Sequence, residues 1–373
     1  MPQHSPIPDD TPDDPSTDAR SGRGDDGIGP RRRGPRKSAG GITLRDVAQL
    51  AGVAPITASR ALNTPSAVSP KVLQKVREAV EKTGYVPNLL AGGLASNKSR
   101  LVAVVVPTVI GPVFQEIVHT LTETLAAAGY QVMLGQSGYE NSREDALLEA
   151  IIGRRPDGVV LTGIMRSAEA RKRLLASGIP VVETWDLTPT PIDMLVGFSH
   201  EAIGREVARY LHQRGRKKVA VVGGRDERSQ RRMQSFAQEA VALGMNDGQG
   251  AAALPMYHVI APTTLGQGRR GLADLLQQQP DTDAIFCSSD LLALGVMIEA
   301  QSRGIAIPGQ LAVVGFGDLE FSRDLQPRLT TVRIDGTGIG QRAARFIIDR
   351  AAGIEVAERI IDVGFSIIQR ESA

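Results

Sequence analysis

The sequence is poor in cysteine and in aromatic residues. Cys287 is the single cysteine among 373 residues, so no disulfide can form within the chain. A lone cysteine is consistent with a reducing cytoplasm, and we expect Cys287 to be a small buried side chain. Aromatic residues make up 4% of the chain, which leaves few rings to stack on a ligand. Trp185 and Phe316, which follow apolar runs, are the candidates for that role.

Long apolar runs and the common nucleotide-binding motifs are missing as well. No stretch has the length and hydrophobicity of a secretory or membrane-spanning segment, which predicts a cytoplasmic protein. No G-x-G-x-x-G directly follows an expected strand, and there is no P-loop and no G-x-S-x-G. The histidines lack the spacing of metal ligands and are expected in surface or capping roles: His119, His200, His212 and His258. We predict no enzyme activity, no cofactor and no metal site.

Residues 1–41 are rich in Pro, Asp, Ser and Gly and have almost no large apolar side chains, so we expect a disordered tail. The formal net charge of the whole chain, +2, is too small to indicate nucleic acid by itself. A basic run, Arg31 to Lys37, stands directly before the first helical segment. It could lie along DNA phosphates, or it could be a solvated charge run that pairs with the acidic residues of the same tail.

The segment from Thr43 to Asn63 reads as two short helices and a tight turn. Thr43, with Asp46 three residues later, is a capping-box start, and Gly52 supplies the permissive backbone of the turn. Pro55 suits the first position of a second helix that ends near Leu62. This arrangement is typical of a helix-turn-helix, which places the second helix in the DNA major groove, although a plain helical hairpin has the same pattern.

A third helix follows this pair. Ser69 and Pro70 form a second start signal, and the apolar stripe of the helix ends near Gly84. From Leu101 onward, short apolar runs alternate with longer amphipathic segments, which indicates a parallel α/β domain with ligand sites at the carboxyl ends of the strands. Its length predicts two lobes. The expected strands are LVAVVVP, YQVMLG, DGVVLTG, IPVVETWD, KVAVVGG, DAIFCSSD and LAVVGFGD, and the expected helices include 112–128, 142–152, 201–214 and 228–243.

The strings TLRDVAQLAGVAPITASRALN and VSPKVLQKVREAVEKTGYVPN, followed by a linker that contains Leu94, resemble the LacI–GalR family of sugar-responsive repressors. The resemblance implies a helix-turn-helix domain at 42–88, a hinge linker at 89–100 and an effector-binding and dimerisation domain at 101–373. That domain would have the fold of periplasmic sugar-binding proteins. Three crossovers near Phe198, Thr330 and Gly353 would then divide it into lobe 1, about 101–198 and 331–353, and lobe 2, about 199–330 and 354–373.

The resemblance also implies roles on DNA. Pro55, Ile56 and Arg60 match the positions that read bases, and Thr57, Ser59 and Asn63 match positions that contact phosphate. Arg60 can form a bidentate pair with guanine. The alternative is that Arg60 pairs with a carboxylate such as that of Asp46. Ala54 stands where the family usually has a serine cap, and Ala58 stands where a larger β-branched residue is usual.

In the linker, Ala91 and Leu94 match the hinge residues that enter the minor groove when the family binds its operator. Gly92 and Gly93 each disfavour a helix by about 1 kcal/mol relative to Ala. We therefore expect the hinge to order only on DNA. A plain flexible linker is the alternative.

The family pattern suggests a set of effector-binding residues at strand ends. They are Thr108, Trp185, Asp186, Arg232, Ser289, Phe316 and Gly317. Asp290 is expected to cap the helix after FCSS instead of binding ligand. The strings VVETWD, DMLVGFSHEA, DERS and QPRLTTV look most like the gluconate-responsive branch of the family. A cationic surround for a carboxylate, or else a solvated basic helix face, is offered by Arg225, Arg228, Arg231, Arg232 and Arg328.

These features predict a homodimeric transcriptional regulator that binds a near-palindromic operator. We expect it to be a repressor and to be controlled by a sugar or sugar-acid effector. Two other classes of protein share parts of the pattern. A sugar-binding transport protein would share the large domain but has no use for Thr43 to Asn63. A sugar-acid enzyme would need acid–base or metal residues in the cleft, and none is evident.

Overall fold

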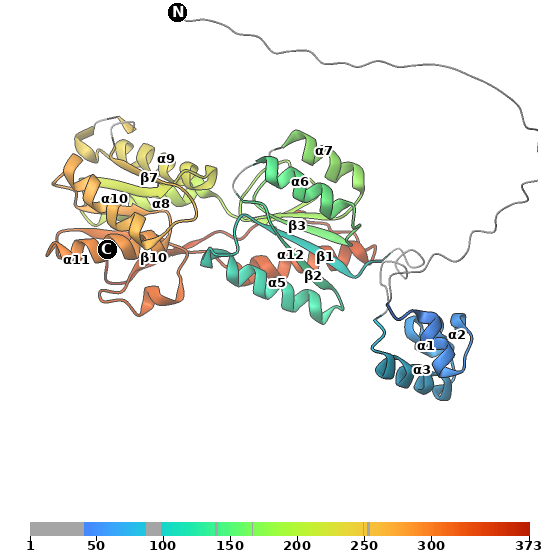
Figure 1. Cartoon of the computed structure of the whole chain (residues 1–373). Helices are drawn as coiled ribbons and strands as arrows, with labels where there is room; N and C mark the ends of the chain where they lie inside the picture. The colour runs from blue at the N-terminus through green and yellow to red at the C-terminus, as the bar shows by residue number, and fades with distance from the viewer. Residues whose placement is uncertain (1–40, 87–97, 139–140, 166, 249, 252–253) are drawn as a thin grey trace, which may run out of the picture. The chain divides into compact units, whose positions relative to one another are not determined.

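The computed structural model describes residues 41–86, 98–138, 141–165, 167–248, 250–251 and 254–373 (Figure 1). The chain forms two compact units, Met1–Pro87 and Asn88–Ala373. We call the described part of the first unit the head and that of the second unit the core, and we describe each by itself. Within the described ranges, no helix has both the length and the apolar character needed to cross a membrane.

The head consists of three α-helices and a short 3-10 turn. These are α1 (Leu44–Ala51), α2 (Pro55–Asn63), η1 (Pro65–Ala67) and α3 (Pro70–Thr83). The amide and hydroxyl of Thr43 both donate to Asp46 Oδ2 at 2.7 Å, and Gly52 ends α1 with a φ of 65°. Pro55 and Pro70 occupy first helical positions. The predicted boundaries of all three helices are therefore confirmed to within a residue or two.

The hydrophobic interior of the head is built almost entirely from alanine and valine. Val47 and Ala48 of α1, Ala58 of α2 and Val76 of α3 are nearly inaccessible to solvent. Small side chains let the three helices approach closely, since each helix contributes a narrow apolar stripe instead of bulky residues. One face of α2 is consumed by this packing, so its remaining residues are turned outward.

The core unit contains two six-stranded sheets. The first has the order β11-β5-β4-β3-β1-β2 and is parallel throughout. Its strands are β1 (Leu101–Val106), β2 (Gln131–Gln136), β3 (Gly158–Thr162), β4 (Val181–Thr184), β5 (Met194–Gly197) and β11 (Ile360–Asp362). Strands such as β1 are apolar along their whole length because helices cover both faces of a parallel sheet.

The second sheet has the order β12-β10-β9-β8-β6-β7, in which only β12 runs antiparallel to its neighbour. Its strands are β6 (Val219–Gly224), β7 (Met256–Val259), β8 (Ala284–Cys287), β9 (Ala312–Phe316), β10 (Thr330–Arg333) and β12 (Ser366–Ile368). In each sheet the strand order reverses beside its first strand, β1 or β6. Such reversals open a crevice at the carboxyl ends of the strands, where ligands bind in this type of fold.

Helices cover both faces of each sheet (Figure 1). The first sheet lies between the pair α5 and α12 and the pair α6 and α7, and the second has α8 and α9 on one face and α10 and α11 on the other. Their bounds are α5 (Gln115–Ala127), α6 (Asn141–Ile152), α7 (Ala168–Ser177), α8 (His200–Gln213), α9 (Glu227–Ala242), α10 (Leu265–Gln278), α11 (Asp290–Ser302) and α12 (Gly336–Ala351). The 3-10 turns are η2 (Pro112–Phe114), η3 (Asn246–Gly248) and η5 (Glu320–Arg323). These layers confirm the predicted α/β fold class.

The chain passes between the two sheets three times. The first passage lies at 198–199, between β5 and α8, and the second lies at 334–335, between β10 and α12. Thr330 itself belongs to β10 of the second sheet. The third passage lies at 363–365, between β11 and β12, so the expectation of a crossover near Gly353 was wrong. The error arose because β11 is short and follows α12 in the same sheet, which the sequence pattern does not reveal.

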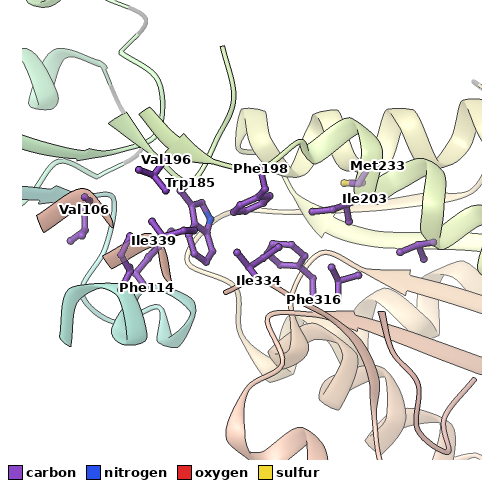
Figure 2. Close-up of a cluster of buried hydrophobic side chains, with 14 of the residues drawn as sticks. Val106, Phe114, Trp185, Val196, Phe198, Ile203, Met233, Phe316, Ile334 and Ile339 are labelled. Carbon is purple, nitrogen blue, oxygen red and sulfur yellow. The ribbon is translucent and has the colours of Figure 1, made fainter. Parts of the chain in front are cut away.

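A single apolar cluster runs through both lobes. Figure 2 shows Trp185 beside Phe114 and Phe198, with Phe316 and Ile334 following toward the second sheet. The ring of Trp185 meets those of Phe114 and Phe198 edge to face, with centroids 5.3 and 5.2 Å apart. Edge-to-face aromatic pairs add about 1 kcal/mol each beyond the area that they bury. The junction of the two lobes is therefore filled by tightly packed aromatic side chains.

Glycines allow close contact between α10 and α11. A Cβ placed at Gly268 would lie 2.2 Å from the carbonyl oxygen of Leu292, and one at Gly295 would lie 2.1 Å from that of Leu265. The string G-Q-G-R-R-G at 266–271 thus lies inside α10. Its second glycine serves helix packing and not the binding of a phosphate.

Substitution of Gly268 by alanine should lower the free energy of unfolding of the core by about 1 to 3 kcal/mol, because the added methyl group would force α10 and α11 apart. Gly266 of the same helix has only the end of the Arg270 side chain, at 3.9 Å, near its Cβ position. Gly266→Ala should therefore be neutral or stabilise by up to about 1 kcal/mol. Urea unfolding of both variants measures the difference, and equal effects would contradict the packing role.

Candidate functional site

The outward face of α2 carries the residues expected to meet DNA. Ile56, Arg60 and Asn63 share that face at helical spacing, and Ile56 is 64% exposed. Ser59 is half-buried and accepts a hydrogen bond from Asn63 Nδ2 at 3.2 Å. The side chain of Ile56 is therefore free of the packing inside the head and accessible to a partner.

The N-terminal end of α2 is open to solvent. Pro55 is exposed, Thr57 is half-buried, and Ala54 occupies the N-cap without a side-chain hydrogen bond. Unpaired amides at such a helix end attract anions, including phosphate. The alternative pairing of Arg60 with Asp46 is absent from the head as described, where the Asp46 carboxylate accepts from Thr43. The hinge residues Ala91 and Leu94 lie outside the described residues.

The core holds a cavity of about 120 Å³ where the carboxyl ends of both sheets meet. Thr108 follows β1, and Trp185 follows β4. The loops after β6, β7, β8 and β9 supply the opposite side. Its polar lining comprises Thr108, Asp226, Arg228, Ser229, Arg232, Thr263, Ser288 and Ser289, and its apolar lining includes Ile110, Val113, Phe114, Trp185, Phe316 and Leu319. A mostly apolar wall with a few convergent polar groups is typical of a small-molecule site.

Arg232 is the most deeply buried charge of this cavity. It is 4% exposed, and burial lowers its pKa to about 10, so it remains protonated at neutral pH. Its Nη1 donates to His200 Nδ1 at 2.9 Å, and its Nη2 donates to Ser229 Oγ and to the Ser288 carbonyl, both at 3.2 Å. Phe316 covers one face of the guanidinium, with Cζ 4.1 Å from the ring centroid.

The tautomer of His200 follows from its two partners. Arginine can only donate, so Nδ1 of His200 is the acceptor, and Nε2 must carry the proton that it donates to the Trp185 carbonyl at 3.0 Å. Burial, and then the charges of Arg232, Arg228 and Arg231, hold the pKa of His200 well below its ordinary value. This residue is neutral and fully buried, so the expectation of a surface or capping role for it was wrong. Ser199 is the cap of α8.

Among the described residues that line the cavity, Asp226 is the one with a carboxylate. Its oxygens accept from the Ser229 amide at 3.1 Å and from the Ser229 hydroxyl at 2.6 Å, which caps α9. Burial raises the pKa of Asp226, but Arg232, the Ser229 hydroxyl and Arg228 outweigh it, and the pKa lies below its ordinary value. The carboxylate is therefore ionised. Arg228 reaches across to the first sheet, where Nη1 donates to the Thr162 carbonyl at 3.3 Å.

Several residues that the sequence suggested for the effector site do not line the cavity. Asp186 is buried in an ion pair with Arg231, which also contacts Glu201, and neither Asp186 nor Arg231 lines the cavity. Gly317 is outside the lining too, and its φ of 129° would strain any other residue. Of the five arginines proposed as a cationic surround, Arg228 and Arg232 line the cavity. Arg225 is exposed outside the lining, and Arg328 pairs with Glu371.

Asp290 is not the cap of α11. That role belongs to Ser289, whose hydroxyl accepts from the Leu292 amide, so the expectation for Asp290 was wrong. The buried carboxylate of Asp290 instead accepts from the Leu319 amide at 2.8 Å, the Ser322 hydroxyl at 2.8 Å and the Thr331 hydroxyl at 2.6 Å. It fixes the loop after β9, which carries Leu319 into the cavity wall.

A larger hollow of about 910 Å³ lies elsewhere on the core, between α9 and β7. It is lined by Lys218 and Asp281 near the amino ends of strands and by several glutamines. Ligands of this fold bind at the opposite, carboxyl ends of the strands. The smaller cavity is therefore the candidate small-molecule site.

Residues 43–88 match the family described as bacterial regulatory proteins of the lacI family, and residues 208–373 match the periplasmic binding protein-like domain. The HTH-type transcriptional regulator GntR of Pseudomonas aeruginosa is 37% identical over 339 residues, which cover 90% of this chain and 97% of that protein. The chain belongs to the LacI family. It is a DNA-binding transcriptional regulator.

Solved structures agree with this assignment. A LacI-family regulator from Silicibacter pomeroyi superposes with a TM-score of 0.82 at 31% identity, and the match covers 89% of this chain and 99% of the other. The transcriptional regulator CelR, in complex with cellobiose, gives a TM-score of 0.64 at 27% identity over 89% of this chain and 100% of its own. The two-sheet core of this LacI-family regulator therefore has the same fold as the solved structures of these transcriptional regulators.

Sequence reasoning missed several residues of this regulator's cavity, among them Ser229, Thr263 and Ser288. Ser288 lies near the end of the predicted strand string DAIFCSSD, so its position was available as a signal. Thr263 follows β7, whose four residues MYHV do not form a continuous apolar run. The role of His200 carried no local signal, because its partners lie 15 and 32 positions away in the sequence.

His200→Gln should weaken the pH dependence of the core's stability. A group whose pKa is lowered by folding stabilises the fold above its unfolded pKa, about 6.5, and that contribution is lost as the pH falls. The glutamine can still accept from Arg232 and donate to the Trp185 carbonyl, but it cannot titrate. Urea unfolding at about pH 7.5 and about pH 5.5 should show a larger loss of stability in the wild type than in the variant. Equal losses would contradict a neutral buried His200.

Proposed function

We propose that this LacI-family regulator is a homodimeric repressor whose operator affinity is lowered by a sugar-acid monoanion, such as gluconate, bound in the cavity between its two lobes. The observation that supports the choice of ligand is the charge of the cavity lining. Among the described lining residues, two guanidinium groups, Arg228 and Arg232, face one carboxylate, Asp226, so the lining carries one excess positive charge. Arg231 adds none, because it is paired with Asp186 and Glu201. Glu144, which is outside the lining, also interacts electrostatically with Arg228, and its pKa is raised by burial.

The polar groups between these charges suit a polyhydroxylated chain. Hydroxyl side chains that can both donate and accept line both sides: Thr108 belongs to the first lobe, and Thr263 and Ser289 belong to the second. Phe114 and Phe316 offer apolar surface for the carbon backbone of the ligand. The volume of about 120 Å³ is below the roughly 300 Å³ of common ligand pockets, so entry requires the lobes to move apart.

Effector control requires that the ligand bind one arrangement of the lobes better than another. A ligand that contacts both lobes has this property, since its contacts depend on their separation. The arrangement that favours the ligand would then differ from the one in which two heads fit a near-palindromic operator. A regulator of this kind works where the DNA is, which in a bacterium is the cytoplasm.

On DNA, we infer that Arg60, Ile56 and Pro55 read bases and that Thr57, Ser59 and Asn63 contact phosphates. Arg60 is exposed, and its side chain has no partner among the described residues of the head, so its guanidinium is available for guanine. Ile56 can add an apolar contact to a thymine methyl group. Ala91 and Leu94 are proposed as minor-groove residues on the strength of the family pattern alone. A sugar-transport role is not supported, because the head would have no use.

Gluconate should weaken operator binding. A duplex selected from a random pool with the purified full chain supplies the operator, and a mobility shift is then measured at saturating D-gluconate. The expected result is a fall in the fraction of bound duplex, whereas D-glucitol, the neutral polyol of the same length, should have a smaller effect. An unchanged shift with gluconate and with a panel of other sugar acids would refute the proposed effector class.

Arg60→Met should reduce affinity for the selected operator by about 10- to 100-fold, because it removes a bidentate base contact, and should scarcely change affinity for a scrambled duplex. Arg77, which is exposed on α3, provides a control with the same change of charge. Arg77→Met should affect both duplexes to a similar, small extent. Fluorescence anisotropy at one fixed salt concentration measures all four affinities. Equal losses on both duplexes in Arg60→Met would assign Arg60 to phosphate contact instead.

A further inference from the structure

The two arginines of the cavity differ in how many donors they have left for a ligand. A guanidinium has five N–H donors, and it can hold a carboxylate bidentately on either of two edges, both of which include Nη2. On Arg232, both Nη2 hydrogens already have protein acceptors, Ser229 Oγ and the Ser288 carbonyl. A carboxylate could grip Arg232 bidentately only by displacing one of these buried bonds.

Arg232 has few N–H groups left to donate to a ligand. Its Nε is buried and has no hydrogen-bond partner among the described residues. One face of the guanidinium is closed by Phe316, and Nη1 is held by His200. This leaves single N–H groups, which suit one hydroxyl oxygen of a ligand better than a planar carboxylate.

Arg228 has the opposite character. It is half-buried in the cavity wall, and its one hydrogen bond with the described residues runs from Nη1 to the Thr162 carbonyl, at a long 3.3 Å. Its Cζ also lies 5.6 Å from the ring centroid of Phe114. Within the described residues, no carboxylate forms an ion pair with it. Two carboxylates, those of Asp226 and Glu144, lie close enough to interact electrostatically with Arg228. The carboxylate of Asp226 accepts hydrogen bonds from the amide and hydroxyl of Ser229.

We propose that Arg228, and not Arg232, holds the carboxylate of the effector, while Arg232 positions the cavity wall and offers a single donor to a hydroxyl. This inference rests on the proposed function and names the residue that discriminates an acid from a neutral sugar. Arg228 belongs to α9 of the second lobe but touches Thr162 and Phe114 of the first. The carboxylate therefore binds at the boundary between the lobes, where it replaces the weak bond to the Thr162 carbonyl with charge-assisted bonds.

Calorimetric titration of the full chain with D-gluconate and with D-glucitol tests this assignment. Arg228→Met keeps the length and apolar stem of the side chain and removes its charge. We expect about a 10- to 100-fold loss of gluconate affinity and little change for glucitol. Arg228→Lys should recover part of the loss, since it restores the charge without the fork. Arg225→Met, which removes an exposed arginine outside the lining, is the matched control and should bind gluconate as the wild type does.

Arg232→Lys separates the two roles. If Arg232 positions the wall, its replacement should weaken gluconate and glucitol by similar factors. If Arg232 holds the carboxylate, the loss will be confined to gluconate, and the inference is overturned. Gluconate affinity within about two-fold of wild type in Arg228→Met would overturn it independently.

Failure of the proposed function has a different signature. In that case the wild type itself binds no sugar acid, and the assignment of Arg228 falls with the effector class. A wild type that binds gluconate while Arg228→Met binds equally well refutes the role of Arg228 alone. Circular dichroism and a cooperative thermal transition confirm that each variant is folded before it is titrated.

Discussion

The buried guanidinium of Arg232 is the group around which the cavity between the lobes is arranged. Removing such a charge from water costs several kcal/mol, so it persists only where acceptors surround it. Here the acceptors come from three places: His200 at the start of α8, Ser229 on α9 and the Ser288 carbonyl after β8. Satisfying one charge thus fixes the relative position of three segments that are distant in the sequence.

The same interaction reaches the first lobe through His200. Its second ring nitrogen donates to the Trp185 carbonyl, and Trp185 packs between Phe114 and Phe198 at the junction of the lobes. Arg232 is therefore connected to the first crossover by a continuous series of buried contacts, through His200 and Trp185 to Phe198. Arg228 provides a second and weaker link between the lobes, and a weak link is the one that a ligand can exchange for a better bond.

The head was almost fully predictable from the sequence, because its signals are local. Thr43 with Asp46, Gly52, and the prolines at 55 and 70 each act within one helical turn, so the boundaries of the helices follow from neighbouring residues. In the core, the seven strands with continuous apolar runs were also predictable. β5, β7, β10, β11 and β12 were not, and each of them lies at the edge of its sheet or beside the edge strand. β4 and β8 are as short, but they lie inside the sheets and belong to longer strings that were predicted as strands. The cavity followed the same division. Strand ends located Thr108, Trp185, Ser289 and Phe316, whereas the availability of each arginine depends on partners that only the folded chain brings near.

Trp185 has a further consequence. It is the sole tryptophan of the chain, it lines the cavity between the lobes, and its backbone adopts a φ of 69°, which non-glycine residues seldom tolerate. The indole emission of the native protein therefore originates at one point, in the wall of this cavity and at the junction of the lobes. The intrinsic fluorescence of Trp185 can therefore be used to follow binding in the cavity without a dye, a label or an engineered residue.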